Sequence, residues 1–191
     1  MLYIYFLKTI AIDSSIYMIN KAIKNNSIDY RVCYLNQVNE TNFNLITAFS
    51  QIVNHLTSLN LLEDFIKNVS LKIDINGIFY FDIFNYYFFN KNSPKYEYRQ
   101  LDNNVYYEIN PKIKQYNKEF IEMELNNVLV EKNNKSNYEL KMKIWNNKLI
   151  IDLCYKYNFK LLKISNMLDI FNDTTCYETN FPKISLIFVK F

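Results

Sequence analysis

The sequence contains a single glycine, Gly77, among its 191 residues. Loops that bring the backbone close to a nucleotide or a phosphate use several glycines, because a Cβ atom would block the approach or oppose the positive φ that such loops need. The sequence therefore carries no glycine-rich loop of this kind. The one glycine follows an asparagine, and Asn76-Gly77 is a dipeptide typical of turns. We expect a turn here that leads into a strand.

Composition predicts an ordered protein with a substantial core, since half of the residues are hydrophobic. We expect one domain, residues 1–191. The 22 basic and 19 acidic side chains are spread along the chain, whereas a nucleic-acid surface needs clustered positive charge, so we expect no nucleic-acid partner. Three distant cysteines, Cys33, Cys154 and Cys176, indicate neither a metal site nor a disulfide framework and favour a cytoplasmic location.

The apolar opening, residues 1–7, has no basic segment before it and no small-residue cleavage site after it, so it does not match a signal peptide. No other stretch approaches the roughly 20 apolar residues of a membrane span, so we expect no membrane partner.

Hydrophobic patterns in the first half alternate between strand and helix. Apolar runs predict strands over residues 9–12, 30–34, 43–49 and 78–83, and the last of these is continuously apolar, as in a buried parallel strand. Helical spacing of Ile16, Ile19 and Ile23 predicts a helix that begins after Asp13-Ser14-Ser15, and a longer one follows Ser58. This order favours βαβ units in an open, mostly parallel sheet.

The second half begins with a different pattern. Residues 96–142 alternate between apolar and polar side chains, which predicts antiparallel strands inserted into the domain. A helix over residues 149–157, with Trp145 at its start, and strands over residues 161–164 and 184–189 complete the chain. The aromatic run from Tyr86 to Phe89 either fills the core or walls a pocket.

Three segments resemble the class I S-adenosylmethionine-dependent methyltransferases that act on small molecules. Residues 50–58, SQIVNHLTS, followed by a helix and residues 76–82, NGIFYFD, are similar to an "NHL" segment after the family's fourth strand and to its turn into the fifth. Residues 11–15, AIDSS, with Tyr17, Met18 and Ala22, resemble "GIDxSxxML..A" at the end of the second strand. Residues 157–160, YNFK, resemble the "aGFk" that precedes the sixth strand.

The resemblance implies a Rossmann-like fold, S-adenosylmethionine as cofactor, and a methyl group transferred to an oxygen or nitrogen of a small molecule. Cofactor binding falls on Asp13, which would hold the ribose hydroxyls, and on Ser14, Asn36 and Phe49. The resemblance assigns His55, the only histidine, as the catalytic base. It assigns substrate binding to Asn54, Asp82 and Asn85. The residues also have structural interpretations that do not depend on the family. Asp13 can be a helix N-cap, His55 can be a partly buried histidine whose ring is satisfied by backbone groups, and Asp82 and Asn85 can cap loops.

The chain departs from the family at its start, because the first strand and the "DxGxGxG" loop have no counterpart. We expect activity to be impaired for this reason. The alternative is a noncatalytic interaction protein, degenerate or split, whose sheet is completed by a partner: a second copy or a complementing N-terminal fragment.

Overall fold

The computed structural model describes residues 8–102, 105–131, 134–166 and 181–191. The apolar opening and Cys176 lie outside these ranges. The chain divides into two compact units, one ending at Thr41 and the other beginning at Asn42. No helix in the described part is both long enough and apolar enough to cross a membrane.

The first unit is a parallel two-stranded sheet with its connecting helix. It contains β1 (Thr9–Asp13), α1 (Ile16–Lys21), β2 (Ile28–Val32) and a 3-10 turn, η1 (Leu35–Gln37). β2 begins and ends two residues earlier than expected, because in the parallel register Val32 lies opposite Asp13 at the end of β1. α1 is shorter than expected and ends before Ile23, which is 95% exposed.

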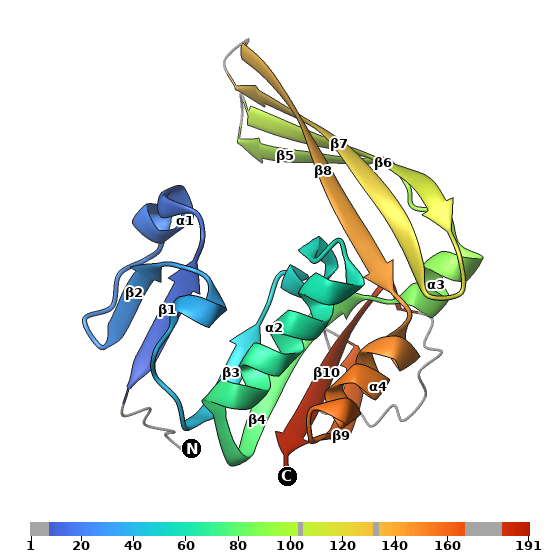
Figure 1. Cartoon of the computed structure of the whole chain (residues 1–191). Helices are drawn as coiled ribbons and strands as arrows, with labels where there is room; N and C mark the ends of the chain where they lie inside the picture. Colours follow the sequence, from blue (N-terminus) through green and yellow to red (C-terminus); the bar gives the residue numbers. More distant parts are fainter. Residues whose placement is uncertain (1–7, 103–104, 132–133, 167–180) are drawn as a thin grey trace. The chain divides into compact units, whose positions relative to one another are not determined.

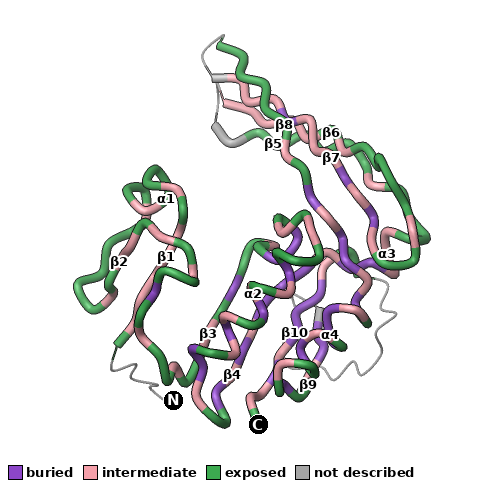
Figure 2. The backbone as a smooth tube through the Cα atoms, viewed as in Figure 1, coloured by how far each residue is buried: buried purple, intermediate pink, exposed green. Residues whose placement is uncertain are grey.

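A mixed four-stranded sheet forms the base of the second unit. Its strands lie in the order β3 (Phe43–Ala48), β4 (Ile73–Phe84), β10 (Lys183–Lys190), β9 (Phe159–Asn166). β3 and β4 are parallel, and β10 is antiparallel to both of its neighbours. Figure 2 shows the buried residues concentrated along β4 and β10, in the middle of this sheet.

Two amphipathic helices, α2 (Leu59–Lys72) and α4 (Asn147–Lys156), lie side by side against this sheet (Figure 1). α2 begins where Ser58 accepts a hydrogen bond from the backbone N–H of Leu61 at 3.2 Å, as an N-cap residue does. Leu62, Ile66 and Val69 face inward and are at most 1% exposed. The longer helix predicted from sequence is confirmed.

Gly77 lies inside β4 rather than at a turn before it, so that expectation was wrong. Phe43 pairs with Ile73 and Leu45 with Ile78, so the β4 residues from 74 to 77 stand opposite Asn44 alone. The excursion is a bulge, and its left-handed residue is Asn76, with φ of 64°. Gly77 has no positive φ; it is needed for its size, as its surroundings leave no room for a Cβ atom.

An antiparallel sheet occupies residues 97–145. Its strands are β5 (Glu97–Asp102), β6 (Val105–Tyr116), β7 (Phe120–Glu131) and β8 (Asn134–Trp145), paired in chain order. Trp145 ends β8 instead of starting the last helix, because the hydrogen-bonded register with β7 continues to the Phe120–Trp145 pair.

The base of this antiparallel sheet packs on α3 (Tyr86–Lys91), as Figure 1 shows. Tyr86 is buried in a cluster with Ile121, Met123, Met142 and Ile144. Tyr87 and Phe89 pack against the same cluster. These residues of the aromatic run therefore contribute to the core, which was one of the two expectations.

Candidate functional site

The loop between β3 and α2 is held in an unusual backbone conformation. Ser50 and Gln51 are consecutive and both have positive φ, 63° and 58°. Residues other than glycine rarely adopt this region, and the strain is tolerated only where the surroundings fix it. Gln51 caps a 3-10 turn, η2 (Ile52–His55), which ends the loop. Strained loops of this kind are concentrated at functional sites.

Asp82 fixes this loop from β4. Its carboxylate is fully buried and accepts a hydrogen bond at 3.2 Å from the backbone N–H of Gln51, and a second from the Gln51 side-chain amide. Lys183 of β10 donates to Oε1 of the same glutamine at 3.2 Å. Both carboxylate oxygens are therefore engaged in positioning the loop.

Asn54 connects three elements and is 0% exposed. Its Nδ2 donates to the carbonyl of Lys143 in β8 at 2.8 Å, and its Oδ1 accepts from the backbone N–H of Phe84 at 2.9 Å. Near the same end of β8, the Trp145 indole N–H donates to the Leu56 carbonyl at 3.0 Å. The loop is thereby tied to both sheets of the second unit.

Asn85 is equally buried and starts α3 by accepting from the backbone N–H of Tyr87 at 3.1 Å. Its Oδ1 also accepts from Asn147 at 2.8 Å, and its Nδ2 donates to the Phe181 carbonyl at 3.0 Å. The structure thus gives Asn54, Asp82 and Asn85 bracing roles. Their assignment to substrate stays a prediction.

Phe49 and His55 are the two predicted residues of this loop that face solvent. Phe49 is 44% exposed, and its ring meets Tyr80 edge to face at a centroid distance of 4.8 Å. His55 is exposed and, within the described ranges, makes no hydrogen bond through its ring, so the expectation of backbone satisfaction finds no support. Partial desolvation lowers the pKa of His55 below its ordinary value. A lowered pKa favours the neutral imidazole, which is the form that can accept a proton.

The carboxyl ends of β1 and β2 bring Asp13, Ser14 and Asn36 to one edge of the first unit, because parallel strands end at the same edge. Asp13 Oδ1 accepts from the backbone N–H of Ser15 at 2.7 Å, while Ser15, not Asp13, is the N-cap of α1. Within the described part of the chain, the other oxygen of Asp13 takes no hydrogen bond. Ser14 and Asn36 are exposed.

The sequence reasoning missed Gln51 and Lys183, which hold the strained loop together with Asp82. Gln51 gives no sequence signal, since a left-handed position is ordinarily recognised by glycine or asparagine. Lys183 gives none either, because the antiparallel register that places it opposite Phe84 is a property of the sheet.

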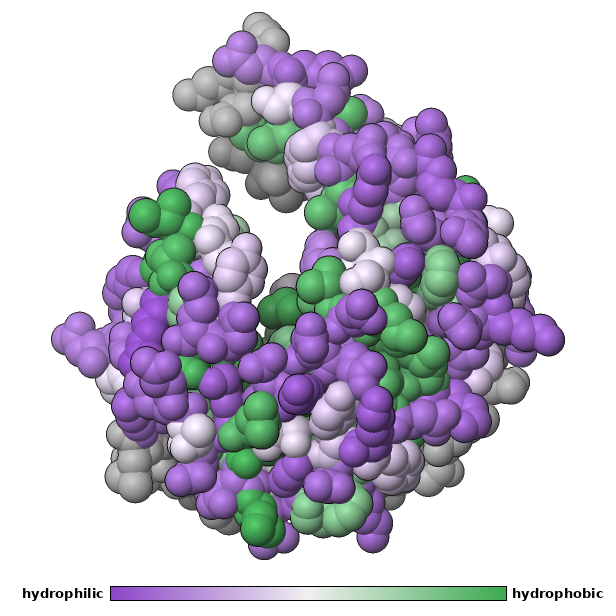
Figure 3. All heavy atoms as spheres, in the orientation of Figure 1, coloured by the Kyte–Doolittle hydropathy of each residue, from purple (hydrophilic) through white to green (hydrophobic). Residues whose placement is uncertain are grey.

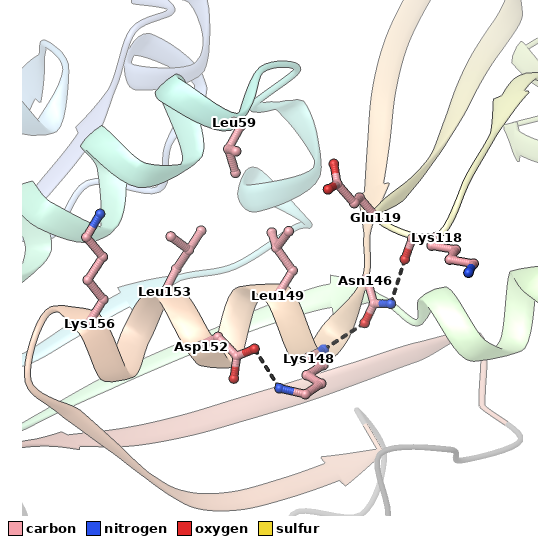
Figure 4. A pocket seen from close by; sticks show the side chains of 9 residues that line it. All are labelled: Leu59, Lys118, Glu119, Asn146, Lys148, Leu149, Asp152, Leu153 and Lys156. Carbon is pink, nitrogen blue, oxygen red and sulfur yellow. Dashed lines mark hydrogen bonds and ion pairs between the residues drawn. The ribbon is translucent and has the colours of Figure 1, made fainter.

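A groove of about 440 Å³ lies between α2, α4 and the turn that joins β6 to β7. Figure 4 shows Leu149 and Leu153 of α4 pointing toward Leu59 of α2 across the groove, and Figure 3 shows apolar surface at this place. Two ion pairs lie at its rim, Lys148 with Asp152 at 2.7 Å and Lys156 with Glu63. Asn146 Nδ2 donates to the Lys118 carbonyl at 2.8 Å.

Comparison with known proteins identifies the fold. No protein-family model matches the sequence, and no curated protein matches it. Solved structures do match over nearly the whole chain. An S-adenosylmethionine-dependent methyltransferase from Clostridium acetobutylicum is 17% identical with a TM-score of 0.72, over 96% of this chain and 75% of its own. The CcbJ methyltransferase from Streptomyces caelestis is 9% identical with a TM-score of 0.75, over 96% and 80%.

A third match is CalS10 from Micromonospora echinaspora, an amino pentose methyltransferase solved with S-adenosylmethionine bound. It is 8% identical with a TM-score of 0.69, over 97% of this chain and 75% of its own. The chain therefore has the Rossmann-like fold of the class I methyltransferases, as its sequence motifs predicted. At these identities the likeness establishes the fold.

Proposed function

We propose that this chain is an S-adenosylmethionine-dependent methyltransferase-like protein that acts on a small molecule. The observation that carries the proposal is the likeness of nearly the whole chain to methyltransferase structures. The sugar N-methyltransferase KedS8 from Streptoalloteichus is among them, with a TM-score of 0.66. A hydroxyl or amine of a small metabolite is accordingly the proposed methyl acceptor.

Recognition of the cofactor's ribose is assigned to Asp13. Its unengaged oxygen can accept hydrogen bonds from hydroxyl groups while the other is held by Ser15, so the carboxylate fits this task. Ser14 and Asn36 lie at the same edge, where Asn36 offers an amide to the adenine. No glycine lies at this edge of the first unit to let the backbone approach the methionine portion of the cofactor, since the single glycine, Gly77, is in β4. We therefore propose that turnover by this chain alone is low.

The bound cofactor supplies an electrophilic methyl group on a positively charged sulfur. An acceptor oxygen or nitrogen would take that methyl group from the cofactor's sulfur and would lose a proton. Neutral His55 is proposed to take that proton. Phe49, in the same loop, offers an exposed apolar face that would help to exclude water. Asn54 and Asp82 would act by fixing this loop.

Isothermal titration of the purified full chain with S-adenosylmethionine tests the proposal. We expect saturable binding by the wild-type chain, a weaker affinity for Asp13→Asn, and an unchanged affinity for the matched variant Asp29→Asn, at an exposed position of β2. Folded wild-type protein that gives no binding heat at any cofactor concentration would overturn the enzyme assignment for this chain.

A second candidate, an interaction protein completed by a partner, is favoured by the strand edges. In the described part of the chain, β3 pairs only with β4, and its residues from Phe43 to Ala48 carry no charge. Uncharged, unpaired edges readily accept a further strand. Hydrogen exchange of the β3 amides tests this idea: fast exchange in dilute protein that slows with protein concentration supports pairing between copies, and concentration-independent slow exchange contradicts an open edge.

A further inference from the structure

Tyrosines gather around a glutamate on one face of the antiparallel sheet. The register places Tyr98 of β5 directly opposite Glu108 of β6, and Tyr106 lies two residues before Glu108 on the same strand, so the three side chains share a face. The Tyr98 and Tyr106 rings lie 5.3 Å apart between centroids. Tyr96 belongs to the same group, since desolvation raises the pKa of its hydroxyl and the nearby Glu108 carboxylate raises it further. Tyr96 and Tyr98 are both more than half exposed, so a ligand can reach them.

Glu108 carries the negative charge of this group. Its side chain is partly buried, and no ion pair within the described ranges includes it. Arg99 follows Tyr98 in sequence but belongs to the other face of the sheet, where it pairs with Glu97 at 2.5 Å. Lys112, the next basic residue of β6, is four residues away, or about 13 Å. A partly buried carboxylate without a cation beside it is unfavourable, so this position favours a positively charged partner.

A hollow of about 380 Å³ lies on the side of Glu108 that is away from Tyr98. Its lining comprises Asn126, Asn127, Val128, Asn137, Tyr138 and Glu139. Val128 of β7 lies directly opposite Glu108, and Asn137 of β8 lies directly opposite Val128, so these lining side chains share the face that carries the tyrosines. Among the described residues of the lining, the one charged side chain is that of Glu139, which is exposed and pairs with Lys141 at 3.5 Å. A tyrosine, a carboxylate and the hollow therefore follow one another in a single row across the sheet.

We propose that Glu108 and the tyrosines around it bind an organic ammonium group, and that the rest of the ligand occupies the hollow. The carboxylate supplies the opposite charge, and tyrosine rings attract cations through their electron-rich faces. Alkyl groups on the nitrogen pack on Val128 and on the rings, which favours a methylated ammonium. The Asn126 and Asn137 amides can hydrogen-bond a hydroxyl or carbonyl elsewhere on the ligand. Glu108 and Glu139 together disfavour an anion.

This site is distinct from the loop that carries His55. Asn54 reaches the sheet at Lys143, which lies opposite Glu122 in β7. Val128 is six residues farther along the same strand, a separation of about 20 Å at the rise of an antiparallel strand. Binding of an ammonium group here therefore does not require the proposed methyl transfer, and a failure to bind would leave that proposal unaffected.

Titration of the isotope-labelled full chain with choline, followed by amide NMR, tests the site. We expect saturable shifts of the backbone resonances of Tyr98, Glu108 and Val128. The uncharged analogue 3,3-dimethylbutan-1-ol has the same shape with carbon in place of nitrogen, so it measures the apolar contribution alone. We expect this analogue to bind more weakly than choline by about tenfold. Equal affinities for the two compounds, or no saturable shift with choline, would overturn the proposal.

Variants separate the charge from the rings. Glu108→Gln should lower the affinity for choline by about tenfold, and Tyr98→Leu, which keeps the charge, should lower it several-fold. Glu119→Gln makes the same change of charge in the exposed turn at the other end of β6 and should bind choline as the wild type does. Lys135 lies opposite Val130 on the face of the site, so Lys135→Gln should bind choline more tightly. An unchanged affinity in Glu108→Gln with a wild-type circular dichroism spectrum, or an equal loss in Glu119→Gln, would overturn the proposal.

Discussion

Alanine at position 77 would place a Cβ atom 2.6 Å from Ile73 Cγ1, 2.8 Å from the Asp74 carbonyl oxygen and 2.9 Å from the Phe43 carbonyl oxygen. The last two atoms are backbone, so they cannot turn away as a side-chain end can. Relief of these contacts requires the bulge to move relative to β3. Overpacking costs about 1–3 kcal/mol, and the two backbone contacts place Gly77→Ala at the upper end of that range.

A smaller effect acts in the opposite direction. Because φ at Gly77 is not positive, alanine can adopt the backbone conformation, and it lowers the entropy of the unfolded chain by a contribution of about 0.4–1 kcal/mol. The net prediction for Gly77→Ala is a loss of about 2 kcal/mol in the free energy of unfolding. With a urea m-value of about 2 kcal/mol/M, the midpoint falls by about 1 M.

Urea unfolding followed by circular dichroism measures this midpoint, with Asn76→Gly as the control. Asn76 has φ of 64°, which glycine adopts freely, so the control should be at least as stable as the wild type. A midpoint for Gly77→Ala that equals or exceeds the wild-type value would refute the steric argument. A similar loss in both variants would also contradict it, because it would point to general sensitivity of the bulge.

Four further predictions concern Asn54, His55 and Glu40. Asn54→Leu leaves the Phe84 N–H and the Lys143 carbonyl unpaired and should cost about 2–4 kcal/mol in urea unfolding, against little change for exposed Asn60→Leu. His55→Gln should lower methyl transfer by about 10²–10⁴-fold at pH 7.5, and a wild-type-like rate would exclude His55 as the base. The pKa of His55 is lowered from 6.5 in the folded state, so the unfolded chain binds the proton more readily. The contribution of His55 to the free energy of unfolding is therefore fully present above pH 6.5 and declines as pH falls below it. His55→Gln should flatten that decline in thermal melts. Hydrogen bonds from Arg31 lower the pKa of Glu40 far below 4.5. The stability difference between the wild type and Glu40→Gln should therefore be present above pH 4.5 and vanish as pH falls through the folded-state pKa of Glu40. A stability difference that does not change with pH would contradict this.

The elements that the sequence predicted well are those whose pattern is local. α2 combines a capping serine with a buried stripe of Leu62, Ile66 and Val69, and both signals are contained within the segment. The extended form of β3 follows similarly from its apolar run. Gly77 was misread because its constraint arises in the folded bulge, where Ile73 and Asp74 close on it, and from Phe43, which is distant in sequence and adjacent only through the β3–β4 register. A dipeptide pattern contains no information about the neighbouring strand.

Several residues assigned to the candidate site from sequence lie on or beside the strained loop, but the sequence did not predict their contacts. Asn54, Asp82 and Asn85 were singled out as polar residues near strand ends, and all three are buried. Their partners are the Lys143 carbonyl, Gln51 and the Phe181 carbonyl. Those contacts arise only when distant segments meet, so the sequence could not distinguish a bracing amide from a ligand-binding one.

The bulge in β4 also controls how fast Asn76 can deamidate. In an asparagine–glycine pair, the glycine nitrogen can attack the asparagine side chain and convert it to aspartate or isoaspartate, a reaction that is fast where the backbone bends freely. Here Gly77 is buried between two strands while Asn76 is exposed, so the attack requires the bulge to open. The rate at which Asn76 deamidates, followed by mass spectrometry, therefore reports how often β4 opens locally at the bulge.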